Sequence, residues 1–173
     1  MEKVRYLNDG ESTNPLTLGY IMSERAYAFL NYSLEQAEGR LKGIKSSLGE
    51  VGGTSDWHDN PALDETHRQV DLWASIIIRK LNLLENVVLI RPRIKTNGVG
   101  FGNRIVLTFG ENVQEETFLM LGPVDATFWK DCISHETPVG KRIMGLATGK
   151  TIQVDVEGEH TLLKIVEILP GDF

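Results

Sequence analysis

The sequence predicts an α+β protein in which a long antiparallel helical hairpin precedes a small antiparallel β-sheet that packs on a short helix. Two stretches repeat apolar residues in alternating steps of four and three, and they flank a short acidic segment. This repeat is typical of two helices that pack along a seam. The second half of the chain changes to a two-residue apolar period, which is typical of half-buried strands. These observations together indicate a coiled-coil hairpin followed by a sheet domain.

The hairpin is predicted within residues 16–90. Ser23 is a suitable N-cap for a first helix that runs to Leu48 and stops at Gly49. Asn60 followed by Pro61 predicts the start of a second helix, which runs to about Asn86. The expected seam positions are Leu30, Leu34, Ala37, Leu41, Ile44 and Leu48 on the first helix and Val70, Ala74, Ile77, Leu81, Leu84 and Val88 on the second.

The remaining segments are predicted as an irregular N-terminal arm, residues 1–15, and a C-terminal domain, residues 91–173. The domain is expected to begin with a linker and the glycine-rich segment 98–102, which we interpret as turns because an alternating strand follows it. Gly158 is expected in a hairpin turn. Strands are predicted at residues 105–109, 117–121, 152–156 and 162–169, with a short helix at residues 139–146.

Composition excludes several classes of protein. The formal net charge of −6 argues against autonomous, sequence-specific nucleic-acid binding, which usually needs a basic face. A single cysteine, Cys132, excludes a disulfide framework, and we expect it to be a buried small residue. No apolar run reaches the roughly 18 residues that a membrane helix needs, and no signal peptide is evident, so we expect a cytoplasmic protein without a membrane partner.

The acidic segment at the hairpin end, about residues 49–61, carries the candidate chemistry. Glu50 to Glu65 contain five acidic residues and no Lys or Arg. Asp56 and Asp59 are close enough in sequence to share Mg²⁺, although two exposed carboxylates alone would bind it weakly. Capping of the second helix by Asp59 and Asn60 is an alternative role. Trp57 has no obvious core to enter and is a candidate contact residue.

The order of further motifs resembles the Gre family of bacterial transcript-cleavage factors from about Leu16 to the end. Asp56, Asp59 and Asn60 occupy the family's tip positions. The resemblance continues through short motifs in the second half of the chain: Val99-Gly100-Phe101-Gly102, Gly122-Pro123, Asp125-Ala126, Ile133-Ser134, Thr137-Pro138-Val139-Gly140, Ile143, Gly145 and Gly149.

This resemblance implies a C-terminal domain of FK506-binding-protein-like fold that docks on RNA polymerase at its secondary channel. The segment Thr137, Pro138, Val139 and Gly140 would meet the polymerase. Asp56 and Asp59 would help to hold Mg²⁺ in the polymerase active site, where backtracked RNA is cut. No metal ion would be tightly bound by the isolated chain, and the protein would be an accessory factor rather than an enzyme.

Further contacts follow from the same resemblance. Trp57, His58 and Asn60 would touch polymerase or RNA at the tip, and Arg40, Lys42 and Lys45 are candidate contacts for the nascent RNA 3′ end. Asp59 replaces the Glu that the family more often has, and Pro61-Ala62-Leu63 replaces Ala-Glu-Tyr. A channel-binding regulator without cleavage activity is therefore the alternative, and a prolyl isomerase or chaperone is a third hypothesis.

Overall fold

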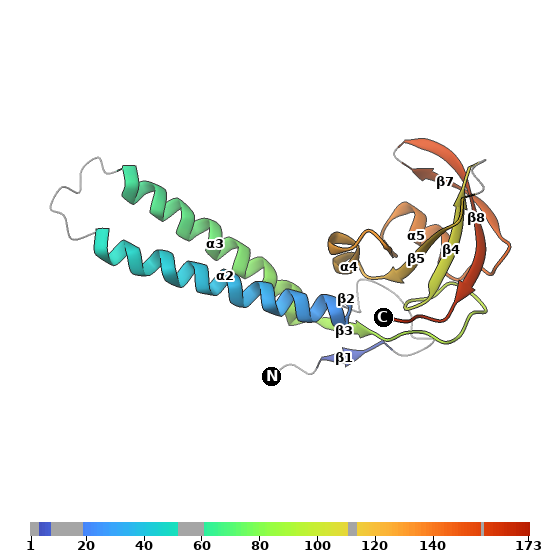
Figure 1. The fold of residues 1–173 in the computed structure, drawn as a ribbon, viewed down its shortest axis with the longest axis horizontal. Helices are drawn as coiled ribbons and strands as arrows, with labels where there is room; N and C mark the ends of the chain where they lie inside the picture. The colour runs from blue at the N-terminus through green and yellow to red at the C-terminus, as the bar shows by residue number, and fades with distance from the viewer. Residues whose placement is uncertain (1–3, 8–18, 52–60, 111–113, 157) are drawn as a thin grey trace. The chain divides into compact units, whose positions relative to one another are not determined.

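The chain folds into two compact units. One unit comprises Met1–Tyr27 and Asn86–Phe173, and the other comprises Ala28–Glu85. The computed structural model describes residues 4–7, 19–51, 61–110, 114–156 and 158–173. Figure 1 shows the second unit as two long helices and the first as curled sheets with short helices. The predicted α+β class is confirmed.

The two long helices are α2, Glu24–Val51, and α3, Pro61–Glu85. Ser23 caps α2 as predicted, because its hydroxyl oxygen accepts a hydrogen bond from the Ala26 N–H at 3.1 Å. The predicted stop at Gly49 is wrong, since α2 continues to Val51. A glycine inside a helix costs only about 1 kcal/mol relative to alanine, so it does not by itself end the helix.

The predicted seam on α2 is confirmed where its side chains are described. Leu30 and Ala37 are buried, and Leu34, Leu41 and Ile44 are half-buried, whereas the side chain of Leu48 lies outside the described part. The face toward α3 therefore carries these apolar residues, as expected from the repeat.

The predicted seam on α3 is correct at four of its positions and wrong at two. Val70, Ala74, Ile77 and Leu84 are half-buried. Leu81 is 43% exposed, and its neighbour Lys80 is half-buried instead. Val88 lies in a strand beyond the end of α3. Between Ile77 and Leu84 the seam advances by three residues and then by four, rather than by four and then three. The position between them is therefore Lys80 and not the predicted Leu81.

A three-stranded parallel sheet lies at the root of the long helices and was not predicted. Its strands are β1, Arg5–Tyr6, β2, Tyr20–Ser23, and β3, Val87–Ile90, in the order β1-β3-β2. Both long helices lie between β2 and β3 in the chain, and they provide the crossover that parallel neighbours require.

This sheet changes two of the predicted boundaries. Arg5–Tyr6 pairs with Val88 and Leu89, so the arm expected to be irregular contributes a strand. The helical unit begins at Ala28 and ends at Glu85, rather than spanning 16–90, because β2 and β3 pack with the sheet domain. Two-residue strands have no periodicity of their own, and their pairing depends on partners far away in sequence.

A second sheet of five strands forms most of the C-terminal region, in the order β6-β5-β4-β8-β7. The strands predicted at residues 105–109, 117–121 and 162–169 lie in the interior of this sheet. The expectation of a purely antiparallel sheet is wrong, because β5 and β6 run parallel. The strands are β4, Arg104–Phe109, β5, Glu116–Leu121, β6, Cys132–Ser134, β7, Thr151–Val156, and β8, Glu159–Leu169.

Two short helices accompany this sheet. Helix α5, Pro138–Ile143, covers part of the predicted 139–146 helix, and Ile143 enters the main core fully buried. Helix α4, Pro123–Phe128, was missed, since six residues are too few for a helical period to show. The main core comprises Val99, Ile105, Leu107, Met120, Ile143, Val154, Leu163, Ile165 and Ile168.

The predicted turns are present at the glycines. Gly102 has a positive φ of 83°, and a side chain there would meet the Arg91 carbonyl oxygen at 2.2 Å. Gly158 has a φ of 88° in the turn between β7 and β8. Within the described ranges, no helix is both long and apolar enough to cross a membrane.

Candidate functional site

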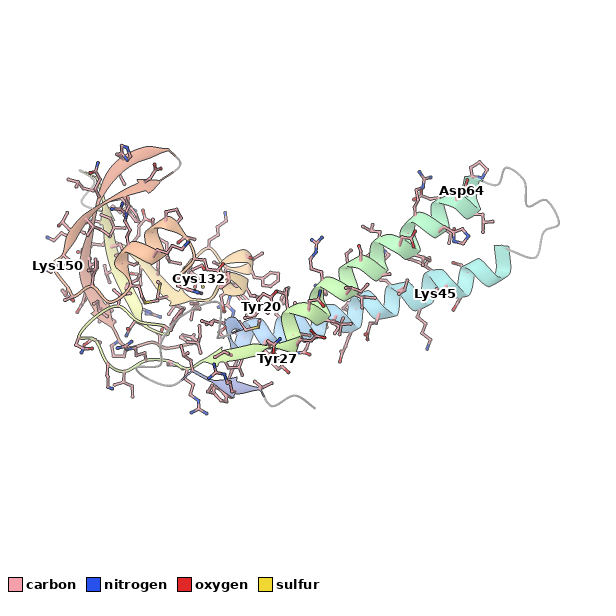
Figure 2. The ribbon with its side chains drawn as sticks, turned by 180° about the vertical axis from the view of Figure 1, so that it is seen from behind. Tyr20, Tyr27, Lys45, Asp64, Cys132 and Lys150 are labelled. Atoms are coloured by element: carbon pink, nitrogen blue, oxygen red, sulfur yellow. The ribbon has the colours of Figure 1, made fainter. Side chains whose placement is uncertain are left out.

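The free end of the helical unit is where the sequence places the acidic tip. Helix α2 ends at Val51 and α3 begins at Pro61, and Figure 2 shows Lys45 and Asp64 near these ends. The start of α3 at Pro61 is confirmed. Asp64 lies in the first turn of α3, where the helix dipole favours a carboxylate.

The predicted tip residues lie outside the described residues. They are Asp56, Trp57, His58, Asp59 and Asn60, so their assignment as tip contacts and Mg²⁺ ligands stays a prediction. Across the ranges that are described, no group of three His, Cys, Asp or Glu side chains is placed to hold a metal ion. Two aspartates three positions apart in the sequence offer the oxygen ligands that Mg²⁺ prefers, but they would complete its coordination only with ligands from elsewhere.

Two of the three predicted RNA-contact residues lie together on α2. Lys42 and Lys45 line a groove of about 480 Å³, together with the apolar side chains of Leu41 and Ile77. Glu38 and Ser46 complete its wall. The groove therefore combines two ammonium groups and one carboxylate with apolar side chains.

Arg40, the third predicted contact, does not line this groove. Its guanidinium lies over the ring of Trp73 on α3, 5.0 Å from the ring centroid. A cation at this distance from an indole face is attracted by the ring quadrupole. Arg40 therefore contacts the partner helix, and Trp73 is half-buried beside the seam.

A second polar contact joins the two helices nearer their root. The Lys80 ammonium donates to the Ser33 hydroxyl oxygen at 2.8 Å. That hydroxyl in turn donates to the Leu30 carbonyl oxygen at 2.8 Å. Neither contact was predicted, because the apolar repeat predicts Leu81 rather than Lys80 as the seam residue.

The predicted docking segment, Thr137, Pro138, Val139 and Gly140, forms the start of α5. Thr137 is the N-cap, and its hydroxyl accepts from the Gly140 N–H at 3.0 Å and donates to the Ser134 carbonyl oxygen at 2.7 Å. A side chain at Gly140 would lie 2.0 Å from that same carbonyl oxygen. The segment is thus held firmly on the end of β6.

One side of this segment is exposed to solvent. Thr137 and Pro138 are exposed, whereas Val139 is half-buried against the main core. Pro138 also borders a cavity of about 370 Å³. The other residues around this cavity are Arg142, Gln153, Val154, Asp155 and His160.

His135 anchors the segment from inside. Its side chain is 8% exposed and lies edge-on to Phe101, with ring centroids 4.8 Å apart. Burial lowers the pKa of His135, although the Glu136 carboxylate partly opposes this shift. The imidazole is therefore neutral at pH 7, and it acts as a packing group beneath the docking segment.

The root of α2 is attached to α4 through a buried carboxylate. The Ser23 N–H donates to Asp125 Oδ2 at 3.0 Å, and the Ser23 hydroxyl donates to Asp125 Oδ1. Asp125 is fully buried, and desolvation raises its pKa while the hydrogen bonds from Ser23 lower it. Arg25 adds a cation–π contact, since its guanidinium lies 3.7 Å from the centroid of a Trp129 ring.

In the sequence, Asp125 belongs to a Gre-like motif, but the motif does not indicate its role. Gly122 belongs to the same junction, because a side chain there would lie 1.7 Å from the Ile21 carbonyl oxygen. The one available signal was a carboxylate two residues after Pro123 in an otherwise apolar stretch. Cys132 is buried, as expected, and burial raises its pKa to about 12.

Comparison with known proteins gives a match over the C-terminal region. Residues 94–170 match the family described as "Transcription elongation factor, GreA/GreB, C-term". The C-terminal region is therefore similar to the GreA/GreB C-terminal domain. The resemblance of the chain to the Gre family, which the sequence motifs indicate, is thereby confirmed. Thr137–Gly140, Gly122 and Asp125 all lie inside the matched Gre domain.

Relatives extend the similarity to the helical unit. Transcription elongation factor GreA of Clostridium perfringens is 24% identical over 156 residues, which cover 85% of this chain and 99% of the relative. GreA factor homolog 1 (Gfh1) of Thermus thermophilus is 21% identical, with a TM-score of 0.38 over 85% of this chain and 96% of that one. The GreA/GreB structure from Nitrosomonas europaea is 20% identical, with a TM-score of 0.38 over 87% and 98%.

Proposed function

We propose that this protein is a transcription elongation factor that binds RNA polymerase at its secondary channel and supports Mg²⁺-dependent cleavage of backtracked RNA. The observation that carries the proposal is the combination, in one chain, of a GreA/GreB C-terminal domain with a helical hairpin whose connecting segment contains Asp56 and Asp59. Cleavage belongs to the polymerase in this proposal, so the chain is an accessory factor rather than an enzyme.

The length of the hairpin supports such a role. Helix α2 has 28 residues and therefore extends about 42 Å at 1.5 Å per residue. The acidic segment between Val51 and Pro61 is carried at the end of this helix. A carboxylate pair delivered by a long, narrow element can reach a site inside a larger assembly that a globular surface could not enter.

The Mg²⁺ ion is proposed to be shared with the polymerase. Asp56 and Asp59 would supply carboxylate oxygens, which Mg²⁺ prefers, and the ion when bound would activate a water molecule for attack on phosphate. Asn60 precedes the first residue of α3 and would cap that helix. Trp57 and His58 would contact polymerase or RNA beside the carboxylates.

Two described surfaces have the properties that the proposal requires. The segment Thr137–Gly140 is rigidly held and exposes Pro138, which suits docking on the polymerase. The groove with Lys42 and Lys45 has ammonium groups that suit the nascent RNA 3′ end. Arg40 is a weaker candidate for RNA contact, because its guanidinium is already stacked on Trp73.

Specific tip residues favour a second candidate function, a channel-binding regulator without cleavage activity. Asp59 has one methylene fewer than the Glu usual in the family, and Pro61-Ala62-Leu63 lacks the acid and the tyrosine of Ala-Glu-Tyr. Both functions use the same docking surface, and they differ only in whether the tip supports hydrolysis.

A stalled, backtracked elongation complex distinguishes the two functions. Added protein should shorten the RNA from its 3′ end, and Asp56→Asn with Asp59→Asn should abolish the shortening while leaving binding to polymerase nearly unchanged. Asp64→Asn is the matched control, because Asp64 is exposed in the first turn of α3. Binding without any shortening by the unmodified protein would support the regulator instead, and absence of binding would refute both.

A further inference from the structure

The helical hairpin is joined across its seam by a polar pair in a row of positions that is otherwise mainly apolar. Lys80 belongs to the half-buried row of α3 that also contains Val70, Trp73, Ile77 and Leu84. Leu81, the next residue, is left exposed. A helix turned slightly to bury Leu81 would gain apolar contact, so the observed arrangement gives up hydrophobic stabilisation to keep Lys80 in the seam.

The contact made by Lys80 is directional. The Ser33 hydroxyl has one proton, which it donates to the Leu30 carbonyl oxygen. Its oxygen lone pairs are therefore the groups that face α3, and one of them accepts from the Lys80 ammonium at 2.8 Å. An ammonium group can only donate hydrogen bonds, so in this pair Lys80 is always the donor and the Ser33 oxygen the acceptor.

The same pairing would be lost if α3 shifted along α2. A displacement by one turn in either direction brings Lys80 opposite Leu30 or Ala37, which are both buried and have no side-chain acceptor. The partly buried ammonium would then lack its partner, which is unfavourable. Arg40 and Trp73 are each seven residues from Ser33 and Lys80, so their contact satisfies the same register one heptad farther along.

We propose that Lys80 and Ser33 act as positioning residues that fix the register of α3 against α2. A polar residue at one seam position typically selects a single register at a cost in stability. The register determines how Val51, the end of α2, lies relative to Pro61, the start of α3, and hence how the connecting segment is presented. A shift of one turn would displace these ends by about 5.4 Å.

The functional consequence rests on the proposed function. A misplacement of about 1 Å at a reacting centre can reduce a rate by about 10²-fold. A shifted hairpin should therefore carry Asp56 and Asp59 out of reach of a metal ion held by the polymerase, even though both carboxylates are intact. Register selection would thus matter more for activity than for folding.

The register is measured by pulsed electron resonance between spin labels at Glu35→Cys and Asn82→Cys, which replace exposed residues on α2 and α3. Cys132 is buried with a pKa of about 12, so the native thiol stays protonated and unlabelled at pH 7. We expect one distance in the parent protein and a second, different distance in Lys80→Met. Arg79→Met is the matched control, since Arg79 is exposed one residue away, and Lys80→Arg should restore the single distance.

Thermal unfolding and transcript cleavage complete the test. Lys80→Met should unfold at the same or a higher temperature than the parent, yet stimulate cleavage at least about tenfold less. A single unchanged distance in Lys80→Met would overturn the assignment of register, and two distances with undiminished cleavage would overturn the positioning role. If the parent protein itself stimulates no cleavage, the proposed function fails, while the distance measurement still decides whether Lys80 fixes the register.

Discussion

Replacing Asp125 by alanine tests how the first turn of α2 is held to the sheet domain. The substitution removes the acceptor for two hydrogen bonds, one from the Ser23 N–H and one from the Ser23 hydroxyl. Both partners are buried, with Asp125 fully buried and Ser23 1% exposed, so water does not readily replace the lost carboxylate. The Ser23 hydroxyl also caps α2, and its orientation depends on this partner.

The expected destabilisation follows from opposing contributions. Each hydrogen bond to a charged group contributes about 1.5–3 kcal/mol, so the two bonds together are worth roughly 3–6 kcal/mol. Part of this is offset because the variant no longer buries a carboxylate, whose raised pKa reports an incomplete compensation for desolvation. We expect a net loss of about 2–4 kcal/mol in the free energy of unfolding, or roughly 10 °C in Tm.

Urea denaturation followed by far-ultraviolet circular dichroism, together with calorimetry, measures this loss. Asp125→Asn keeps the shape and one acceptor oxygen, and its amide N–H can donate to the Ser23 hydroxyl, so it should lose no more than about 1 kcal/mol. Asp131→Ala is the control, since it removes an exposed carboxylate from the same region and should change stability by less than about 0.5 kcal/mol.

A double-mutant cycle with Ser23→Ala isolates the contact. If the Ser23–Asp125 pair acts as a unit, the two single changes should be strongly non-additive, with a coupling of at least about 1 kcal/mol. An Asp125→Ala variant as stable as the parent, or additive single effects, would refute the role that we assign to this carboxylate.

Three further predictions concern titration, packing and thiol reactivity. The folded pKa of Asp125 is raised above its ordinary value of 3.8. The stability of the parent relative to Asp125→Asn should therefore be greatest below pH 3.8 and should fall as pH rises through the folded pKa. Urea denaturation across this pH range measures the difference in stability, and a constant difference would contradict the prediction. Gly140→Ala should lower the free energy of unfolding by about 1–3 kcal/mol, because the added Cβ would lie 2.0 Å from the Ser134 carbonyl oxygen. Gly39→Ala should raise it by about 0.5–1 kcal/mol, because no atom lies within 4 Å of a Cβ added at this helical position. Equal effects of the two substitutions in thermal unfolding would disprove the packing argument. Cys132 should react with a thiol reagent at pH 7 only after denaturation, since burial raises its pKa to about 12, and rapid labelling of the native protein would show that this burial is wrong.

Local signals were enough to predict much of the fold. Ser23 caps α2 and Pro61 opens α3, since each effect involves only the next few residues of the chain. The alternating apolar residues of β4 and β7 likewise identified half-buried strands. The acidic tip with Asp56 and Asp59 was found in the same way, as a local pattern, and its role remains a prediction.

Features that depend on distant residues were missed. Strand β1 has two residues, and it exists because Val88 and Leu89 supply its partners. Ser23 and Asp125 are 102 positions apart, and no sequence pattern pairs a helix cap with a carboxylate at that separation. The predicted basic residues were only partly placed by the sequence. Lys42 and Lys45 line one groove, whereas the Arg40 guanidinium lies over the ring of Trp73.

The sequence by itself therefore determined the two long helices, most strands of the C-terminal sheet and the acidic segment between the helices, because periodicity and capping act within a few residues. Only the tertiary structure decided that Lys80 rather than Leu81 enters the seam, since both choices satisfy a seven-residue repeat and differ only in what α2 offers opposite. It also decided that Asp125 holds the root of α2, because a buried carboxylate takes its partners from whatever the fold brings within hydrogen-bonding distance.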